Sequence, residues 1–211
     1  ESTIVIRFWI ISIILAMIGI IIMIGDSFSK GSLFGDLIAL FIPINFAILT
    51  VSDTRTVADD KSGDLLQKLI QTDGHKIVKR LIIPDDRKLI SKTLFKWCFE
   101  EGIEAIISTG GTGLTGRDVS VEGHRDIYDK EIDAFSTLFT EISVKKIGTS
   151  AVQSRACAGI TNGTFLFALP GSPSACKDGW TEILAKQFDY RHMPCNFVEL
   201  LPRLLENDRR K

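Results

Sequence analysis

Short apolar runs that alternate with amphipathic stretches constrain the fold of this chain more than any other feature. Each run has the length and pattern of a buried strand, and the stretches between them carry apolar residues at helical spacing. The apolar runs predict buried strands at Asn45–Val51, Ile103–Ser108 and Gly163–Leu169, and an alternating pattern predicts a strand at Lys76–Ile83. Alternating strands and helices favour parallel pairing through right-handed crossovers, with helices on both faces of the sheet. The sequence therefore predicts an α/β fold.

Helices are predicted around these strands. The first begins with Ser62 as its N-cap and is broken at Asp73-Gly74. The others are Leu89–Phe99, Glu131–Ile142 and Ala175–Phe188. Helical spacing predicts a buried face for each of two helices. In Leu89–Phe99 the predicted residues are Leu89, Ile90, Leu94, Phe95 and Trp97-Cys98, and in Glu131–Ile142 they are Ile132, Phe135, Leu138 and Phe139.

Each predicted strand is followed by a loop of polar or small residues. These loops are Ser52-Asp53, Pro84-Asp85, Thr109–Gly113 and Pro170-Gly171-Ser172. Ligands of parallel α/β sheets bind at the carboxyl ends of the strands. We therefore expect the four loops to meet at one edge of the sheet.

The glycine turn Thr109-Gly110-Gly111-Thr112-Gly113 is the strongest functional signal. Glycines allow positive φ and a close approach of the backbone to a ligand. Successive amides can then form a concave nest for phosphate oxygens, and the hydroxyls of Thr109 and Thr112 add donors. The alternative is a plain tight turn, but its place after a buried strand favours a phosphate site.

Two familiar nucleotide motifs overlap this turn. Residues 111–116 match G-x-G-x-x-G, but a strand-helix-strand-helix precedes them, and the acidic residues about 20 positions later lie in a helical pattern. A P-loop requires Lys-Ser/Thr where Arg117-Asp118 stands. Neither motif is therefore predicted to operate here.

Two carboxylates are expected beside the glycine turn. Asp85 ends the second strand region, and Asp118 lies just past the turn. Paired carboxylates beside phosphates commonly hold Mg²⁺, which takes only one or two protein ligands. Glu122 could join them, and Arg117 could pair with charge on a ligand. The alternative for each aspartate alone is a capping or turn residue.

Other polar residues have weaker signals. Ser154-Arg155 combines a hydroxyl with a guanidinium that could bind an anion, or it is a surface loop. The histidines share no spacing typical of a metal site or a Ser-His-Asp triad, and we interpret them as surface or packing residues. The cysteines include no CxxC pair and are expected to be buried and reduced. The histidines are His75, His124 and His192, and the cysteines are Cys98, Cys157, Cys176 and Cys195.

Composition limits the classes of function. The chain has 211 residues, 45% of them hydrophobic, which is enough for one domain with a sizeable core. Its formal net charge is −1, so it lacks the basic excess typical of nucleic-acid binding. No nucleic-acid partner is expected.

Residues 1–42 differ from the rest of the chain. The uncharged stretch Phe8–Gly25 is near the lower length limit for a membrane-spanning helix. With Gly35-Asp36-Leu37, the segment resembles an inner piece of a drug/metabolite-type transporter. One span and half of another cannot form a transport path, so we interpret the segment as a fusion or gene-model remnant. A membrane anchor through residues 8–25 is the alternative.

Several motifs from residue 44 to about residue 205 occur in the order found in one protein family. They are Ile48–Asp53, Asp60–Gly63, Ile83–Asp85, Ser108–Gly113 with Arg117–Val119, Gly148–Ser150, Gln153–Arg155, Leu169–Pro173 and Arg191–Phe197. Together they resemble the MoaB/MogA family of molybdenum cofactor biosynthesis proteins, and the last is similar to bacterial MoaB in particular. Val121 departs from the proline that often stands there in the family.

The resemblance implies a three-layer α/β/α fold over residues 43–211 and a cytoplasmic location. It further implies binding of molybdopterin and, in catalytic members, transfer of AMP from Mg-ATP to its terminal phosphate. Asp85 and Asp118 match the catalytic aspartates of the family. The ligand-binding loops match the glycine turn, Ser154, Arg155 and Pro170-Gly171-Ser172, with Ser52 and Asp53 as further candidates. A homo-oligomer, hexameric or trimeric, is also implied. The alternative function is a non-catalytic molybdopterin-binding or scaffold protein.

Overall fold

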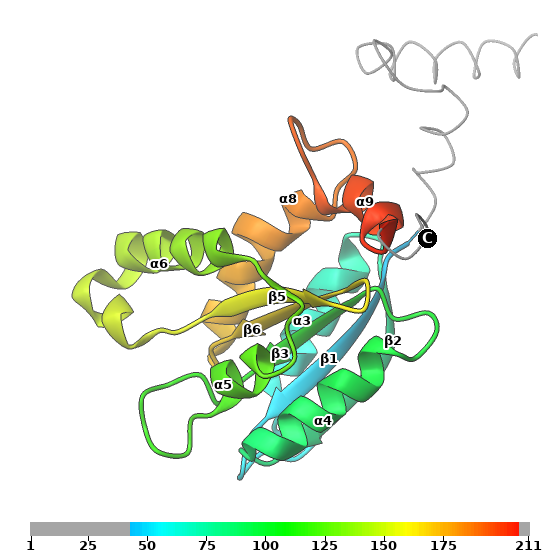
Figure 1. Ribbon diagram of the computed structural model, residues 1–211. Coiled ribbons are helices and arrows are strands. Elements are labelled where there is room, and N and C mark those ends of the chain that lie inside the picture. The colour runs from blue at the N-terminus through cyan, green and yellow to red at the C-terminus, as the bar shows by residue number, and fades with distance from the viewer. Residues whose placement is uncertain (1–42, 207–211) are drawn as a thin grey trace, which may run out of the picture. The chain divides into compact units, whose positions relative to one another are not determined.

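The computed structural model describes residues 43–206, and these residues form one mixed sheet between two layers of helices (Figure 1). Its strand order is β2-β1-β3-β6-β5-β4. Four strands run parallel: β1 (Asn45–Val51), β2 (Lys76–Ile83), β3 (Ala105–Thr109) and β6 (Thr164–Leu169). Strand β5 (Cys157–Thr161) is antiparallel to β6, and β4 (Lys130–Glu131) is antiparallel to β5. The predicted three-layer α/β fold with a mostly parallel sheet is confirmed.

Each face of the sheet has its own apolar core. On one face, α3 (Lys61–Thr72), α6 (Asp133–Ile147) and α7 (Pro173–Asp178) pack over Phe46 and Phe167. On the other face, α4 (Arg87–Cys98) packs over β1 and β3, and α5 (Ser120–Arg125) packs against α4 and β5. The central strands are buried on both faces, as continuous apolar runs in a parallel sheet require.

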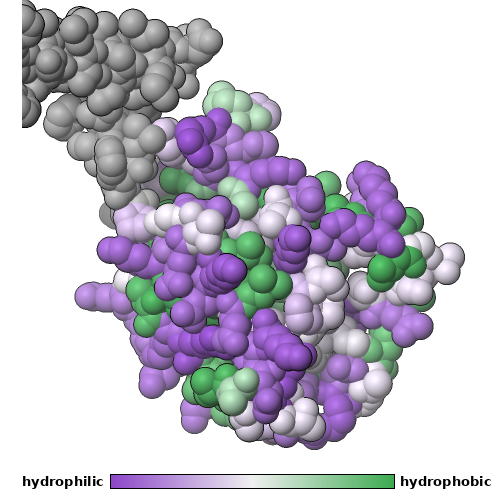
Figure 2. Space-filling view, turned by 180° about the vertical axis from the view of Figure 1, so that it is seen from behind, coloured by the Kyte–Doolittle hydropathy of each residue, from purple (hydrophilic) through white to green (hydrophobic). Residues whose placement is uncertain are grey.

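The remaining elements connect or extend these layers. They are the 3₁₀ helices η1 (Gly148–Gln153) and η3 (Leu201–Arg203), the π-helical η2 (Gly179–Leu184), α8 (Ala185–Gln187) and α9 (Phe197–Leu200). Seen from behind, the described surface is mainly hydrophilic, and its hydrophobic residues form small separate groups (Figure 2).

Strands β4 and β5 were not predicted, and Gly163 lies in a turn instead of a strand. Asn162 and Gly163 both have positive φ, 47° and 76°, and they join β5 to β6. Asn-Gly is the preferred two-residue turn between antiparallel strands. The dipeptide was therefore a usable signal for a hairpin. Because of this hairpin, β5 runs antiparallel to its neighbours β6 and β4, whereas the other neighbouring strands of the sheet run parallel.

Three details of the helices were also predicted wrongly. The N-cap of α3 is Asp60, whose carboxylate accepts a hydrogen bond from the Gly63 amide at 3.0 Å, while Ser62 lies in the first turn. Leu89 and Phe95 are exposed because the buried stripe of α4 runs through Ile90, Leu94, Trp97 and Cys98. Leu138 is exposed for the same reason, since Phe135 and Phe139 define the buried side of α6.

The hydrophobic segment 1–42, with its predicted span at residues 8–25, lies outside the described residues. Within residues 43–206, no helix is both long and apolar enough to cross a membrane.

Candidate functional site

The structure brings the loops that follow β1, β2, β3 and β6 together at one edge of the sheet. They line an open cavity of about 410 Å³, which η1 completes from the side. Ser52, Asp85, Gly111 and Gly171 each come from a different loop, and Ser154 follows η1. Parallel strands end at the same edge, so loops that lie up to about 120 residues apart in sequence become neighbours.

The glycine turn approaches the neighbouring strands more closely than a side chain would allow. Gly110 and Gly111 have φ of 100° and 62°. A Cβ on Gly110 would lie 2.1 Å from the carbonyl oxygen of Val51. The Gly110 amide donates to the Leu169 carbonyl at 3.1 Å, whereas the amides of Gly111 and Thr112 donate to no acceptor within the described residues. Those two amides therefore remain available to an anion in the cavity.

Asp85 lies beside the turn in an unusual polar setting. Its Oδ1 is buried and has no hydrogen-bond partner within residues 43–206, and the same holds for Ser120 Oγ. A Cβ on Gly111 would lie 2.2 Å from Asp85 Oδ1 and 2.5 Å from Ser120 Oγ. Burial, together with the charges of Asp53 and Asp118, raises the pKa of Asp85 above its usual value. The site therefore holds a carboxylate that lacks stabilising donors.

Asp118 has the opposite character. Its carboxylate accepts hydrogen bonds from the Thr115 hydroxyl at 2.5 Å and the Thr115 amide at 2.8 Å. The Thr115 hydroxyl is the main cause of the lowered pKa of Asp118, and it acts with the Thr115 and Gly113 amides. The cavity thus contains one stabilised and one destabilised carboxylate.

Arg117 does not line the cavity. It forms a bidentate ion pair with Asp53, from Nε at 2.9 Å and Nη2 at 2.6 Å to Oδ2. The Arg117 hydrogen bond lowers the pKa of Asp53, which also accepts from the Asp85 amide at 3.1 Å. Asp53 and Arg117 therefore join the loops after β1, β2 and β3, and the charge of Arg117 is already paired.

Arg155 serves the glycine turn from outside the cavity. Its Nε donates to the carbonyls of Thr112 at 2.9 Å and Gly113 at 3.1 Å, and its Nη1 pairs with Glu122 at 2.5 Å. That pairing lowers the pKa of Glu122. The structure therefore gives Arg155 and Glu122 positions that support the glycine turn, and the contact of Arg155 with an anion stays a prediction. Its neighbour Ser154 does line the cavity.

Thr109 and Ser172 both have hydrogen-bond partners within the protein. The buried Thr109 hydroxyl donates to the Pro170 carbonyl at 3.1 Å and lies 3.0 Å from Cys176 Sγ, so it joins two loops and is not offered to a ligand. Ser172 is the N-cap of α7 and accepts from the Ala175 amide at 3.2 Å. Pro170, Gly171 and Thr112 line the cavity.

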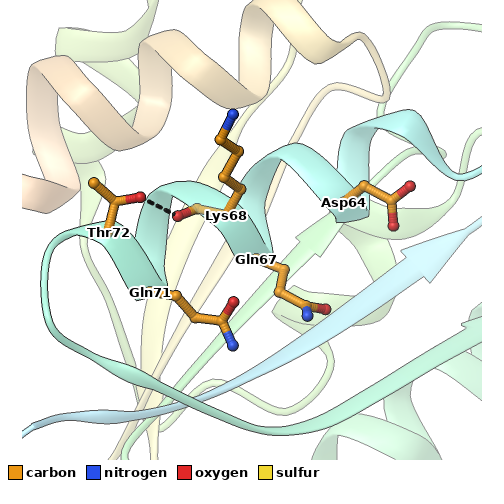
Figure 3. A pocket seen from close by; sticks show the side chains of 5 residues that line it. All are labelled: Asp64, Gln67, Lys68, Gln71 and Thr72. Carbon is orange, nitrogen blue, oxygen red and sulfur yellow. Dashed lines mark hydrogen bonds between the residues drawn. The ribbon is translucent and has the colours of Figure 1, made fainter.

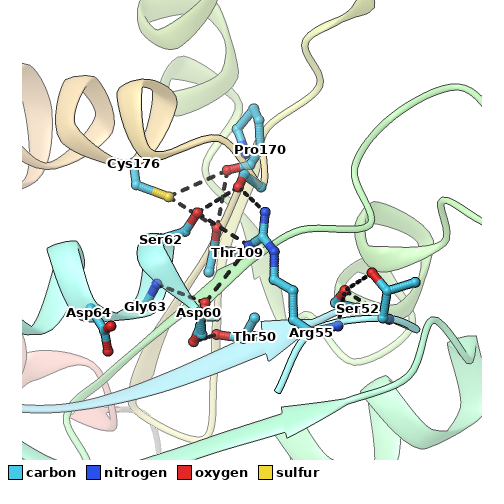
Figure 4. A network of polar contacts seen from close by, with 12 residues as sticks. Thr50, Ser52, Arg55, Asp60, Ser62, Gly63, Asp64, Thr109, Pro170 and Cys176 are labelled. Carbon is cyan, nitrogen blue, oxygen red and sulfur yellow. Dashed lines mark hydrogen bonds and ion pairs between the residues drawn. The ribbon is translucent and has the colours of Figure 1, made fainter. Parts of the chain in front are cut away.

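Arg55 lines the cavity and was missed in the sequence. Figure 4 shows its side chain reaching from the loop after β1 toward Ser62 and the Pro170 loop. Its Nη2 donates to the Gly171 carbonyl at 2.7 Å, and its Nη1 donates to Ser62 Oγ at 3.2 Å. The sequence did carry a signal for it. Arg55 lies four residues after the predicted strand Asn45–Val51, in the loop whose Ser52 and Asp53 were predicted as site residues.

The remaining histidines and cysteines mostly occupy packing positions. His124 is fully buried, with Nε2 2.8 Å from Ser108 Oγ and Nδ1 3.1 Å from the Tyr128 hydroxyl. Burial lowers its pKa to about 3. Cys98, Cys157 and Cys176 are buried and free as expected, but Cys195 is exposed. No cluster of three or more His, Cys, Asp or Glu suited to a metal occurs within the described part of the chain.

A second hollow, of about 420 Å³, lies along α3 (Figure 3). Asp64, Gln67, Lys68, Gln71 and Thr72 line it, and all come from this one helix. Thr72 donates back to the Lys68 carbonyl at 2.7 Å. Because no other element contributes a polar group, the hollow lacks the convergent groups of a built site.

Comparison with known proteins shows the family of the chain. Residues 47–190 match the family described as "Probable molybdopterin binding domain". Molybdenum cofactor biosynthesis protein B of Escherichia coli (strain K12) is 42% identical over 157 residues, which cover 74% of this chain and 92% of that protein. The homologue of the same name from Bacillus cereus is 37% identical, over 68% of this chain and 85% of that protein.

Solved structures give the same result. The tungsten cofactor synthesizing protein MoaB from Pyrococcus furiosus is similar with a TM-score of 0.62 and 34% identity, covering 69% of this chain and 93% of that one. A crystal structure of a molybdenum cofactor biosynthesis protein B has a TM-score of 0.68 and 32% identity, and the match covers 81% of this chain and 99% of that one. The chain therefore belongs to the MoaB/MogA family of molybdenum cofactor biosynthesis proteins.

Proposed function

We propose that this protein acts in molybdenum cofactor biosynthesis, where it binds molybdopterin and transfers AMP to its terminal phosphate from Mg-ATP. The observation that carries the proposal is the convergence of Asp85 and Asp118, from separate loops, on a cavity floored by the glycine turn. Membership of the family supports the pathway, and the geometry supports phosphate chemistry.

The residues present fit a magnesium ion held jointly with phosphates. Mg²⁺ keeps several waters and is usually bound by one or two carboxylates plus substrate phosphates. Asp85 Oδ1 is a buried acceptor without a partner, and the mutual repulsion of Asp85, Asp53 and Asp118 favours a cation among them. When bound, Mg²⁺ would neutralise charge on the triphosphate.

The chain's own residues would position the reactants. The amides of Gly111 and Thr112 would bind phosphate oxygens, and Arg155 would hold the turn in shape through the Thr112 and Gly113 carbonyls. In the reaction, a phosphate oxygen of molybdopterin forms a bond to the α-phosphorus of ATP, and pyrophosphate leaves. Such transfer depends mainly on positioning and charge stabilisation.

The test is an adenylylation assay with the full chain, molybdopterin and Mg-ATP. We expect adenylylated molybdopterin and pyrophosphate, and a rate that Asp85→Asn and Asp118→Asn each lower about 100-fold or more. Asp59→Asn, at an exposed carboxylate, is the control. Binding of molybdopterin without product would refute the proposal and favour the scaffold function.

We further propose that the protein forms a homo-oligomer, hexameric or trimeric, in the cytoplasm. Sedimentation of the full chain tests the first statement, since a monomer at micromolar concentration would contradict it. Fractionation of cells tests the second, because recovery with membranes would favour the anchor at residues 8–25.

A further inference from the structure

Charge is unevenly distributed around the cavity. Its acidic residues are Asp85 and Asp118, next to the glycine turn. Arg55 is the only basic residue among the described residues that line it. The lining therefore offers two carboxylates suited to a cation and one guanidinium suited to an anion.

The guanidinium of Arg55 is held in place but not saturated. Nη2 donates to the Gly171 carbonyl at 2.7 Å, and Nη1 donates to the Ser62 hydroxyl at 3.2 Å (Figure 4). The Ser62 hydroxyl itself donates to the Gly171 carbonyl at 2.6 Å. A guanidinium has five N–H donors, so most of them remain for a ligand. A fixed fork loses little side-chain entropy when it binds an oxyanion.

The positive charge of Arg55 lacks a close carboxylate. Its nearest acidic contact is Asp60 Oδ1, 3.8 Å from Nη1, which is longer than a hydrogen bond. Asp60 is already served by the Thr50 hydroxyl at 2.6 Å and by Arg80 at 2.7 Å. Arg117 and Arg155, by contrast, each donate directly to a carboxylate.

Arg55 also adjoins the glycine turn. A Cβ on Gly171 would lie 3.6 Å from Arg55 Nη2 and 3.1 Å from the Cα of Gly110. The Gly171 backbone is therefore close to both the Arg55 guanidinium and the glycine turn.

We infer that Arg55 is the anion-recognising residue of the cavity and binds phosphate oxygens of the ligand seated on the glycine turn. The inference rests on the proposed function and deepens it. The phosphate can come from the nucleotide or from molybdopterin, because both present the same oxyanion chemistry to a guanidinium.

Calorimetric titration of the full chain tests this inference. Mg-ATP alone and molybdopterin alone form the two arms. We expect Arg55→Met to raise the Kd of at least one of them about 10- to 100-fold, and the affected arm identifies the source of the phosphate. Arg55→Lys keeps the charge but loses the fork, so its Kd should lie between those of wild type and Arg55→Met.

Two further variants separate recognition from loop support. Ser62→Ala removes the hydroxyl that donates to Gly171 and accepts from Arg55 Nη1, but Arg55 keeps its charge and its Nη2 hydrogen bond to Gly171. This variant should therefore raise Kd by less than threefold. Arg203→Met removes a distant cation that pairs with Glu206 and should leave both affinities unchanged. Thermal melting of every variant verifies that it is folded.

Specific results would overturn the inference. One is that Arg55→Met binds both Mg-ATP and molybdopterin with wild-type affinity. The other is that Ser62→Ala and Arg55→Met lose the same amount of affinity. Wild-type binding that depends on Arg55, without any adenylylated product, would uphold anion recognition and refute the proposed reaction. A wild-type chain that binds neither compound would refute both.

Discussion

The candidate site is built around a missing side chain at Gly111. Its φ of 62° is in the left-handed region, and the space where a Cβ would lie is flanked by Asp85 Oδ1 and Ser120 Oγ. Both oxygens are buried without partners in the described residues. A glycine here therefore satisfies the backbone conformation and leaves room for the carboxylate.

Gly111→Ala should destabilise the protein by about 1–3 kcal/mol, because alanine is strained at this φ and its Cβ would displace Asp85. Urea unfolding measures the loss. Gly116→Ala, in the same loop but with open space around it, should change stability by less than about 0.5 kcal/mol. Equal effects of the two substitutions would contradict the account.

The buried carboxylate of Asp85 is predicted to lower the free energy of unfolding at neutral pH. Its pKa is raised in the folded state, so the folded protein binds a proton more readily than the unfolded chain does. Stability is therefore lost as the pH rises from the usual aspartate value of 3.8 through the folded pKa. Asp85→Asn should stabilise the protein at pH 7 while it lowers activity, and the stabilisation should vanish below pH 3.8. Urea unfolding at both pH values tests this, and a variant less stable than wild type at pH 7 would contradict it.

At the scale of elements, Asp60 joins helix α3 to the sheet. Its buried carboxylate caps α3 through the Gly63 amide, accepts from Thr50 on β1 at 2.6 Å and pairs with Arg80 on β2 at 2.7 Å. One side chain thus fixes the start of α3 against two strands. This also places Ser62, and through it Arg55, at the cavity.

Asp60→Ala should cost about 3–5 kcal/mol, because the Arg80 charge loses a buried partner and α3 loses its cap. The neighbouring Asp59 is exposed, and its carboxylate accepts a hydrogen bond from the Thr56 hydroxyl at 2.8 Å. Asp59→Ala should therefore change stability by about 0.5 kcal/mol or less. Chemical denaturation of both variants compares them, and a loss below about 1 kcal/mol for Asp60→Ala would refute the role.

At the scale of the whole molecule, burial of neutral His124 couples stability to pH. Its pKa is lowered to about 3, whereas an ordinary histidine titrates near 6.5. The unfolded chain therefore binds a proton that the folded protein excludes, and stability is lost as the pH falls from 6.5 toward 3. The slope from this one group reaches about 1.4 kcal/mol per pH unit.

His124→Gln should flatten this dependence, because glutamine does not titrate. The free energy of unfolding is measured at pH 7.5 and pH 5.5 for both proteins, so that the contributions of other groups cancel in the comparison. His75, whose pKa is also lowered by burial, adds a slope of the same sign to both proteins, so its contribution cancels in the comparison. Identical pH slopes for wild type and variant would show that His124 is not neutral and buried.

The sequence by itself determined the parallel part of the fold and the place of the site. Residues 45–51 formed a strand with the predicted bounds, since a strand buried on both faces needs a continuous apolar pattern. Residues 76–83 also formed a strand with the predicted bounds, and their alternating pattern fits an edge strand that is only partly buried. The loops after the parallel strands met at one edge because strand direction alone requires it. The β5–β6 hairpin was missed although Asn162-Gly163 was a local signal for it.

Only the tertiary structure decided what each polar side chain does. Arg155, Thr109 and Arg117 carry the right chemistry for an anion, but acceptors from distant segments engage them: Thr112 and Gly113, Pro170, and Asp53. Arg55 was overlooked, yet it retains free donors at the cavity. The physical reason is that the type of a residue determines which hydrogen bonds it is able to form. Which partner it then binds depends on the donors and acceptors that the folded loops bring next to it.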